Sequence, residues 1–241
     1  MPIIFKTNSC KIEKSKDNYK FIYEDGEKYT HFFDKIKKNI SNDIVSQKKN
    51  ESFTVKASKV ESLKELLKRK KNLSYRHLKQ LFTQVNKQLQ SLEEDGYCNL
   101  FLDINDIVRI ETFDETQKGG TGGDIYFLYL NTHHFLPITD TFTTKILKPF
   151  NKNNMFLSTE LKKLNTFPKD IHINSQYYSL ALLTIYCCKW SKKYDNIKFK
   201  KLDLQYDKFS DYLSNIENTK LYFALLRCLV DNPKDRVALY I

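Results

Sequence analysis

The sequence predicts an α+β fold, with a basic, β-rich N-terminal part (residues 1–58) followed by a mainly α-helical C-terminal part (residues 59–241). Three observations predict it. The chain has 241 residues, of which 41% are hydrophobic and 14% aromatic, which is enough to bury a sizeable core. Short β-prone runs bounded by turn residues concentrate near the N-terminus. Longer segments with the helical spacing of apolar residues begin after residue 74.

The first expected sheet lies within the first sixty residues. Residues 19–24 and 27–33 are β-prone runs on either side of Asp25-Gly26, a dipeptide typical of tight hairpin turns. Residues 39–51 are polar and without periodicity, which predicts a loop, and residues 53–57 predict one more short strand. We therefore expect a small antiparallel sheet at the N-terminus.

A second hairpin is expected near the middle of the chain, from strands at 107–113 and 125–130. Four of the six glycines lie between them, within residues 119–123. A phosphate-binding Walker loop needs Lys and Ser or Thr directly after its last glycine, whereas Asp124 and a strand follow here. The glycines therefore predict a hairpin tip rather than a ligand loop.

Helices are expected at 62–70, from Ser74 to Glu94, at 175–189 and at 219–230. The segment after Ser74, a suitable N-cap, is the clearest, because its apolar residues recur every three or four positions. These residues are Leu78, Leu81, Phe82, Val85, Leu89 and Leu92. Residues 175–189 are apolar on nearly all sides, which predicts a helix buried in the centre of the C-terminal part.

The chain is basic, with 40 Lys and Arg against 29 Asp and Glu and a net charge of +11. Residues 1–80 hold 20 of the basic residues against 10 acidic ones, so this part could meet an acidic partner. The run Lys68, Arg69, Lys70 and Lys71 could contact nucleic-acid phosphates, although a solvated helix face is the simpler interpretation. A composition rich in Lys and Asn also reflects an AT-rich genome.

No apolar run reaches the length that a membrane-spanning helix needs, and the first residues do not resemble a secretion signal. The five cysteines include no Cys-x-x-Cys pair, which argues against a disulfide framework or a zinc site. We therefore expect an intracellular, cytoplasmic protein with buried thiols and no membrane contact.

From about residue 52 onward, several phrases resemble the eukaryotic-type protein kinase family in their order and spacing. Residues 96–108 resemble the loop that carries His-Arg-Asp, and residues 127–131 resemble the strand that enters Asp-Phe-Gly. Residues 158–160 stand in place of Ala-Pro-Glu, 176–181 in place of Asp-Val-Trp-Ser-Leu-Gly, and 232–236 match the closing Asp-Pro-x-x-Arg. The resemblance implies a protein-kinase-like fold with a reduced N-terminal lobe and a helical C-terminal lobe.

The same resemblance implies that the groups for phosphoryl transfer are missing. Phe101 stands where the family has its catalytic Asp, and Asp103 replaces the loop Lys. Asp106 replaces the metal-binding Asn, and Asn131 replaces the Asp of Asp-Phe-Gly. Before residue 52 there is a single glycine, Gly26, so no glycine-rich loop could cover a nucleotide. The expectation is a catalytically inactive pseudokinase without bound ATP or Mg²⁺ and without a metal site.

Glu160 and Arg236 would then form the ion pair that ties the family's activation segment to its last helices. A scaffold that binds a protein partner is the leading functional hypothesis. Two alternatives stay open: a divergent, weakly active kinase in which Asp103 or Asp106 has taken over catalysis, and nucleic-acid binding through residues 1–80. The Lys-, Asn- and Ile-rich style resembles proteins of large DNA viruses or AT-rich protists, which would place the protein in a virion or the host cytoplasm.

Overall fold

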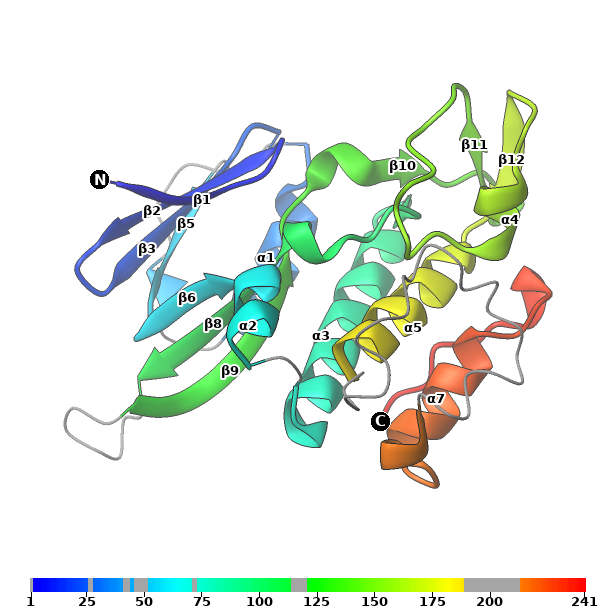
Figure 1. Cartoon of the computed structure of the whole chain (residues 1–241). Helices are drawn as coiled ribbons and strands as arrows, with labels where there is room; N and C mark the ends of the chain where they lie inside the picture. The colour runs from blue at the N-terminus through cyan, green and yellow to red at the C-terminus, as the bar shows by residue number, and fades with distance from the viewer. Residues whose placement is uncertain are drawn as a thin grey trace.

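The computed structural model describes residues 2–25, 28–40, 44–45, 52–70, 73–113, 121–188 and 213–241. It is a mixed α+β structure with several small sheets, as the sequence predicts. In Figure 1 the first sheet and the long β-hairpin lie on one side, and the helices α3, α5 and α7 lie on the other. One continuous cluster of buried apolar residues extends through both sides, from Cys10 to Leu229.

The first sheet is antiparallel and has five strands in the order β1-β2-β3-β5-β4. The strands are β1 (Ile3–Lys6), β2 (Cys10–Ser15), β3 (Asn18–Tyr23), β4 (Ile44–Val45) and β5 (Ser52–Lys56). Alternate residues of the central strands are buried, including Ile12, Phe21 and Val55. Phe21 stacks on Phe53 with ring centroids 4.8 Å apart, so aromatic pairs build the inner face of this sheet.

The hairpin expected at 19–33 is wrong in its second half. β3 occupies Asn18–Tyr23, but the residues that follow the turn form the helix α1 (Thr30–Asn39) instead of a strand. Its apolar residues Phe32, Phe33, Ile36 and Ile40 recur at helical spacing and are all buried, so burial of this face outweighs the β-propensity of the aromatics. Gly26 and Glu27 lie outside the described residues.

The second sheet has three antiparallel strands in the order β6-β8-β9, formed by β6 (Lys59–Ser62), β8 (Ile107–Phe113) and β9 (Thr121–Tyr129). The predicted pairing of the strands after residue 107 is confirmed, while the expected hairpin tip falls partly on residues 114–120, outside the described residues. Gly123 has a structural reason, because a Cβ there would collide with the backbone carbonyl oxygens of Thr112 and Phe113.

The predicted helices are found close to their expected bounds. They are α2 (Leu63–Lys70), α3 (Tyr75–Glu94), α5 (Ser175–Cys188) and α7 (Lys220–Cys228), and the short α4 (Thr159–Lys163) accompanies them. Ser74 caps α3, since its hydroxyl accepts a hydrogen bond from the His77 backbone N–H. α5 is buried along almost its whole length and packs against α3 and α7. No helix in the described ranges is long and apolar enough to cross a membrane.

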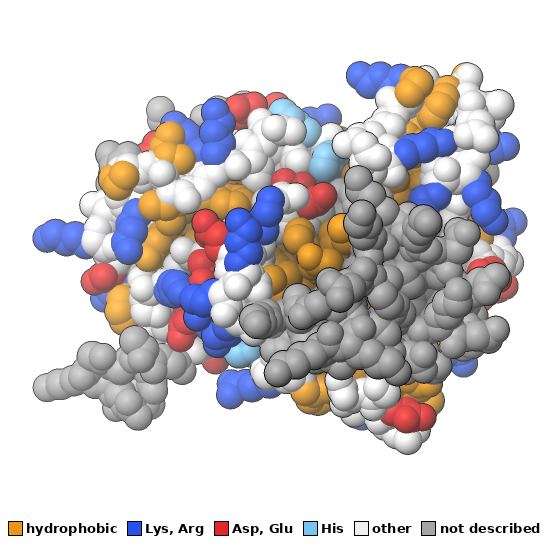
Figure 2. All heavy atoms as spheres, viewed as in Figure 1, with side chains coloured by type: hydrophobic (Ala, Val, Ile, Leu, Met, Phe, Trp, Pro, Cys, Tyr) orange, Lys and Arg blue, Asp and Glu red, His pale blue; other side chains and the backbone are white. Residues whose placement is uncertain are grey.

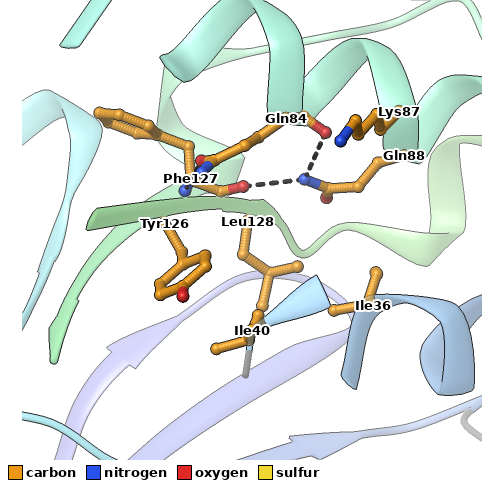
Figure 3. A pocket seen from close by; sticks show the side chains of 8 residues that line it. All are labelled: Ile36, Ile40, Gln84, Lys87, Gln88, Tyr126, Phe127 and Leu128. Carbon is orange, nitrogen blue, oxygen red and sulfur yellow. Dashed lines mark hydrogen bonds between the residues drawn. The ribbon is translucent and has the colours of Figure 1, made fainter. Parts of the chain in front are cut away.

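Two glutamines of α3 attach this helix to β9 (Figure 3). The Gln84 side chain accepts from the Phe127 N–H at 2.7 Å and donates to the Ile125 carbonyl at 3.0 Å. Gln88 donates to the Phe127 carbonyl at 2.8 Å and accepts from the Tyr129 N–H at 2.9 Å. The side chains thus supply the outer strand β9 with hydrogen bonds that a neighbouring strand would otherwise provide.

Two small two-stranded sheets cover the end of the helical part. β7 (Tyr97–Asn99) pairs with β10 (Phe135–Pro137), and β11 (Thr143–Ile146) pairs with β12 (Lys169–His172). A second cluster of buried apolar residues, separate from the main core, lies beneath them and includes Leu100, Ile146 and Leu161. The loops next to these sheets hold Phe101, Asp103 and Asn131, which the sequence analysis singles out.

Candidate functional site

The β8–β9 hairpin brings Asp106 and Asn131 together at its open end, where β8 begins and β9 ends. Asp106 ends a short 3₁₀ turn (Ile104–Asp106) directly before β8, and Asn131 follows β9 by two residues. Both side chains are buried, and the Asn131 amide Nδ2 donates to Asp106 Oδ2 at 3.1 Å. The Leu130 N–H also donates to the Asp106 carbonyl at 2.8 Å. A carboxylate and an amide thus face each other at one buried point.

Tyr129 and His134 complete this cluster, although no sequence motif points to either of them. The Tyr129 hydroxyl lies 2.7 Å from His134 Nδ1 and donates to Asp106 Oδ2 at 3.4 Å. His134 Nδ1 in turn lies 3.6 Å from Asp106 Oδ2. Tyr129 ends a buried strand and His134 ends a short 3₁₀ turn (Thr132–His134), so only the folded structure could reveal that they share the Asp106 carboxylate.

Burial shifts the titration of this cluster. It raises the pKa of Asp106 from 3.8 to about 6, against the opposing effect of the hydrogen bond from Asn131. Burial also lowers the pKa of His134, which favours the neutral imidazole. At neutral pH the cluster therefore holds one partly desolvated carboxylate stabilised by neutral hydrogen-bond donors. Strongly shifted groups of this kind concentrate at functional sites.

Ser9 joins the first sheet to the same site. It lies in the turn between β1 and β2, and its side chain is fully buried. Its hydroxyl accepts from the Thr132 N–H at 2.8 Å and lies 3.2 Å from the Leu130 carbonyl and 3.3 Å from Asn131 Oδ1. The backbone on either side of Asn131 thus has its hydrogen bonds satisfied by a side chain of the N-terminal hairpin.

Phe101 and Asp103 lie beside the cluster. The Phe101 ring packs against Phe150 at 5.1 Å between centroids and against His134 at 5.9 Å. Asp103 accepts from the Asn105 N–H at 2.8 Å, which caps the 3₁₀ turn. Asp103 therefore has a local structural role. The ring of Phe101 lies near it, on the side that opens into a groove.

A large groove opens next to Phe101, with a volume of about 730 Å³. One side is formed by residues around β10, and the other by the segment from Lys145 to Asn154. We call it the Phe101 groove and define it by the apolar residues along it, which are Phe101, Leu136, Pro137, Ile138, Ile146, Leu147, Pro149 and Phe150. It is the site of predominantly apolar character that the sequence analysis missed, because its walls come from segments far apart in the chain.

A second cavity of about 380 Å³ lies between the first sheet and residues 58–62. Phe5, Tyr19 and Val108 line it together with charged side chains. Glu61 is the centre of an ion-pair network there, 3.0 Å from Lys59, 2.8 Å from Arg69 and 3.2 Å from Arg109. The Glu61 carboxylate therefore balances only part of the positive charge of these three cations.

The basic run at the end of α2 is only partly available to a partner. Arg69 donates to both carboxylate oxygens of Glu61, at 2.8 and 3.0 Å. Lys68 and Lys70 are exposed in the last turn of α2 and stabilise its carboxyl end. Lys71 lies outside the described residues. One of the four expected cations is therefore already engaged by an internal carboxylate.

Glu160 and Arg236, which the sequence analysis pairs, form a bidentate contact. Arg236 Nη1 lies 2.5 Å from Glu160 Oε1 and Nη2 lies 3.1 Å from Oε2. Arg236 also donates to the carbonyls of Val230 and Asp231, and its guanidinium lies 4.7 Å from the centre of the Tyr178 ring. Although burial alone raises the pKa of Glu160, hydrogen bonds from Arg236 and Ser175 hold it below its ordinary value. The pair ties α4 and α5 to the C-terminal segment.

Within the described ranges, no group of three or more His, Cys, Asp or Glu side chains is placed to hold a metal ion.

Replacing either member of the buried ion pair is expected to destabilise the protein by about 3 to 5 kcal/mol. Arg236→Ala should cost more than Glu160→Ala, because Arg236 also bonds to Val230 and Asp231. Urea denaturation of both single variants and the double variant measures the coupling, expected at about 2 kcal/mol. The partly exposed pair Lys11–Glu13 on the first sheet is the control, with coupling below about 1 kcal/mol. Additive losses at Glu160 and Arg236 would contradict the assignment.

The same pair predicts acid sensitivity. Because the folded-state pKa of Glu160 lies below 4.5, its contribution is present above pH 4.5 and is lost as the pH falls through the folded-state value. The Glu160→Gln variant should therefore lose less stability than the parent protein between pH 5 and pH 3, measured as a smaller drop in the urea midpoint.

Asp106→Asn is expected to stabilise the protein at neutral pH. The folded-state pKa of Asp106, about 6, lies above its ordinary 3.8, so the folded state holds the proton more tightly and loses stability as the pH rises between these values. Removing the charge should raise the free energy of unfolding by about 1 to 3 kcal/mol at pH 8 and change it little at pH 3. Asp103→Asn, which keeps its capping acceptor, serves as the control. Equal effects at both pH values would refute the buried charge.

Ser9→Ala is expected to cost about 1 to 3 kcal/mol, because the buried Thr132 N–H loses its acceptor. Ser15→Ala, at the far end of β2, should change stability by less than about 0.5 kcal/mol. Hydrogen exchange of the Thr132 amide provides a local measurement, since loss of Ser9 should accelerate exchange there before global unfolding. Unchanged protection of this amide would show that Ser9 does not fasten the site.

No protein-family model matches the chain, and no curated protein matches it at a significant level. The function of the site therefore has to follow from its own residues, which are a buried Asp106–Asn131 pair fastened by Ser9 and an apolar groove beside Phe101.

Proposed function

We propose that the chain is a protein-kinase-like protein without phosphoryl-transfer activity, a pseudokinase scaffold that binds a protein partner. The order of its elements supports this proposal: an antiparallel sheet with one helix, then α2 and α3, then a loop and hairpin, and finally a buried helix. In this interpretation residues 1–58 correspond to a reduced N-terminal lobe and residues 59–241 to a helical C-terminal lobe. The Glu160–Arg236 pair corresponds to the family's structural ion pair.

The proposal rests mainly on two features of the site, which are the ring of Phe101 and the hydrogen bond between Asn131 and Asp106. Phosphoryl transfer needs a group that orients the attacking hydroxyl and anionic ligands for the metal ions that bridge the phosphates. At the first position Phe101 presents a ring packed on Phe150, which can accept no proton. At the second, Asn131 donates its amide to Asp106, so one carboxylate is present where transfer would use two charged or metal-oriented groups.

Ser9 supports the same conclusion from the other side of the site. Its hydroxyl bonds to the Thr132 N–H and the Leu130 carbonyl. In this interpretation the first hairpin therefore lies over the position that a nucleotide's phosphates would approach. Among the described residues of β1, β2 and their turn there is no glycine, and the backbone cannot wrap a phosphate as a glycine-rich loop does.

A weakly active kinase is the second candidate, favoured by two specific features. The cavity of about 380 Å³ beside residues 58–62 could hold part of a nucleotide, and Asp106 retains a carboxylate. Binding of the nucleotide and transfer of the phosphate are separable, so both have to be measured.

Thermal denaturation with and without Mg²⁺ and ATP tests the proposal. A ligand that binds only the folded state at 100 times its Kd stabilises it by about 2.7 kcal/mol, whereas we expect no shift of Tm. Incubation with radiolabelled ATP and a mixture of protein substrates should leave no label on the chain or on the substrates. Transfer of label that Asp106→Ala abolishes, while Lys64→Ala does not, would establish the kinase and overturn the scaffold.

A further inference from the structure

The Phe101 groove has the size and lining of a binding site, and the described residues leave it open. Its volume of about 730 Å³ lies in the range of pockets that bury most of a ligand. The floor is aromatic, because Phe101 packs on Phe150, and Phe150 in turn meets the edge of Phe167 at 6.2 Å. Leu147, on the wall, is 70% exposed, far more than a leucine with a packing role.

The rim of the groove is positively charged. Lys145 and Lys148 lie along it and are exposed, and neither has an ion-pair partner within the part of the chain that the structure describes. Asp103 is the one carboxylate among the lining residues, and it is engaged in capping Asn105. An occupant with negative groups near its apolar part would therefore gain charge complementarity without displacing an internal partner.

Next to the groove, the turn 139–143 presents Phe142 to solvent. Thr139, its first residue, lines the groove. Phe142 is 66% exposed and adopts φ +54°, in the left-handed region that bulky side chains rarely occupy. Two backbone hydrogen bonds hold it there, to Thr139 and from Ile173, each 3.1 Å long. Backbone strain held in place in this way concentrates at binding sites. Figure 2 shows blue Lys and orange apolar side chains together over β11 and β12.

We propose that the Phe101 groove and the Phe142 turn bind an extended segment of a partner protein, with an apolar anchor residue flanked by Asp or Glu. This inference rests on the proposed scaffold function and gives the chemistry of its partner. The aliphatic side chains along the groove offer no hydrogen bonds to the edges of nucleotide bases, which favours an apolar side chain over a nucleic acid. A second copy of the chain is disfavoured, because each copy carries a net charge of +11.

Fluorescence anisotropy with three labelled peptides tests the proposal on the full chain. The first has a Leu-Phe centre flanked by glutamates, the second has the same centre flanked by lysines, and the third has glutamates around an Ala-Ala centre. We expect saturable binding of the first alone. The double variant Lys145→Glu/Lys148→Glu should weaken it at least tenfold, roughly the effect of reversing charges at a rim. Leu147→Ala and Phe142→Ala should each weaken it about tenfold without lowering Tm.

The matched control is Lys16→Glu/Lys56→Glu, two exposed lysines at the end of the first sheet that lies away from Ser9, which should leave the affinity within about twofold. Equal binding of the acidic and basic peptides, equal loss in both double variants, or no binding of any peptide would overturn the proposal. Sedimentation that shows a dimer broken by Leu147→Ala would assign the groove to a second copy and overturn it too. Label transfer from ATP would refute the scaffold function alone, since the groove could still bind its peptide.

Discussion

The register of the β8–β9 hairpin is the constraint on which the site depends. Ile107 pairs with Tyr129, so the residues just outside this pair, Asp106 and Leu130, are brought edge to edge. A shift of one residue would turn Asp106 and Tyr129 to opposite faces and leave a carboxylate buried without partners. The glutamines of α3 hold β9 in place from its outer edge, because each forms hydrogen bonds with particular backbone groups of this strand. The β8–β9 hairpin and α3 thus jointly determine the position of the buried Asp106 carboxylate.

The polar groups of the site explain why it holds a single arrangement. Asp106 receives hydrogen bonds from Asn131 and Tyr129, and Asn131 is held by Ser9. Each of these side chains is buried, so a rearrangement of one would leave another without a partner, at a cost of about 1 to 3 kcal/mol for each group. This cluster is rigid, whereas the neighbouring Phe101 groove is bounded by partly exposed apolar side chains. Rigid polar interior and open apolar surface therefore lie next to each other.

Much of the fold could be predicted from periodicity, because long helices and alternating strands carry strong local signals. α3, α5 and β8 follow the expected bounds, and Ser74 caps α3 as its sequence position indicates. α1 was missed because its aromatics have high β-propensity, and only their burial against the first sheet selects the helix. β11 and β12 are too short and too polar to show the alternation of apolar residues that predicts a strand. Ser9 and Asn131 come together only in the folded chain, so the sequence around either residue could not predict their contact.

The contact between Ser9 and Asn131 has a consequence for how the chain is made. The two residues are 122 positions apart, so the N-terminal hairpin leaves the ribosome long before the strand that fastens it. Until β9 emerges, only α1 and the strands of the first sheet itself can cover its apolar face, so part of this face stays exposed. The N-terminal hairpin can therefore reach its final contacts only after synthesis has passed residue 131.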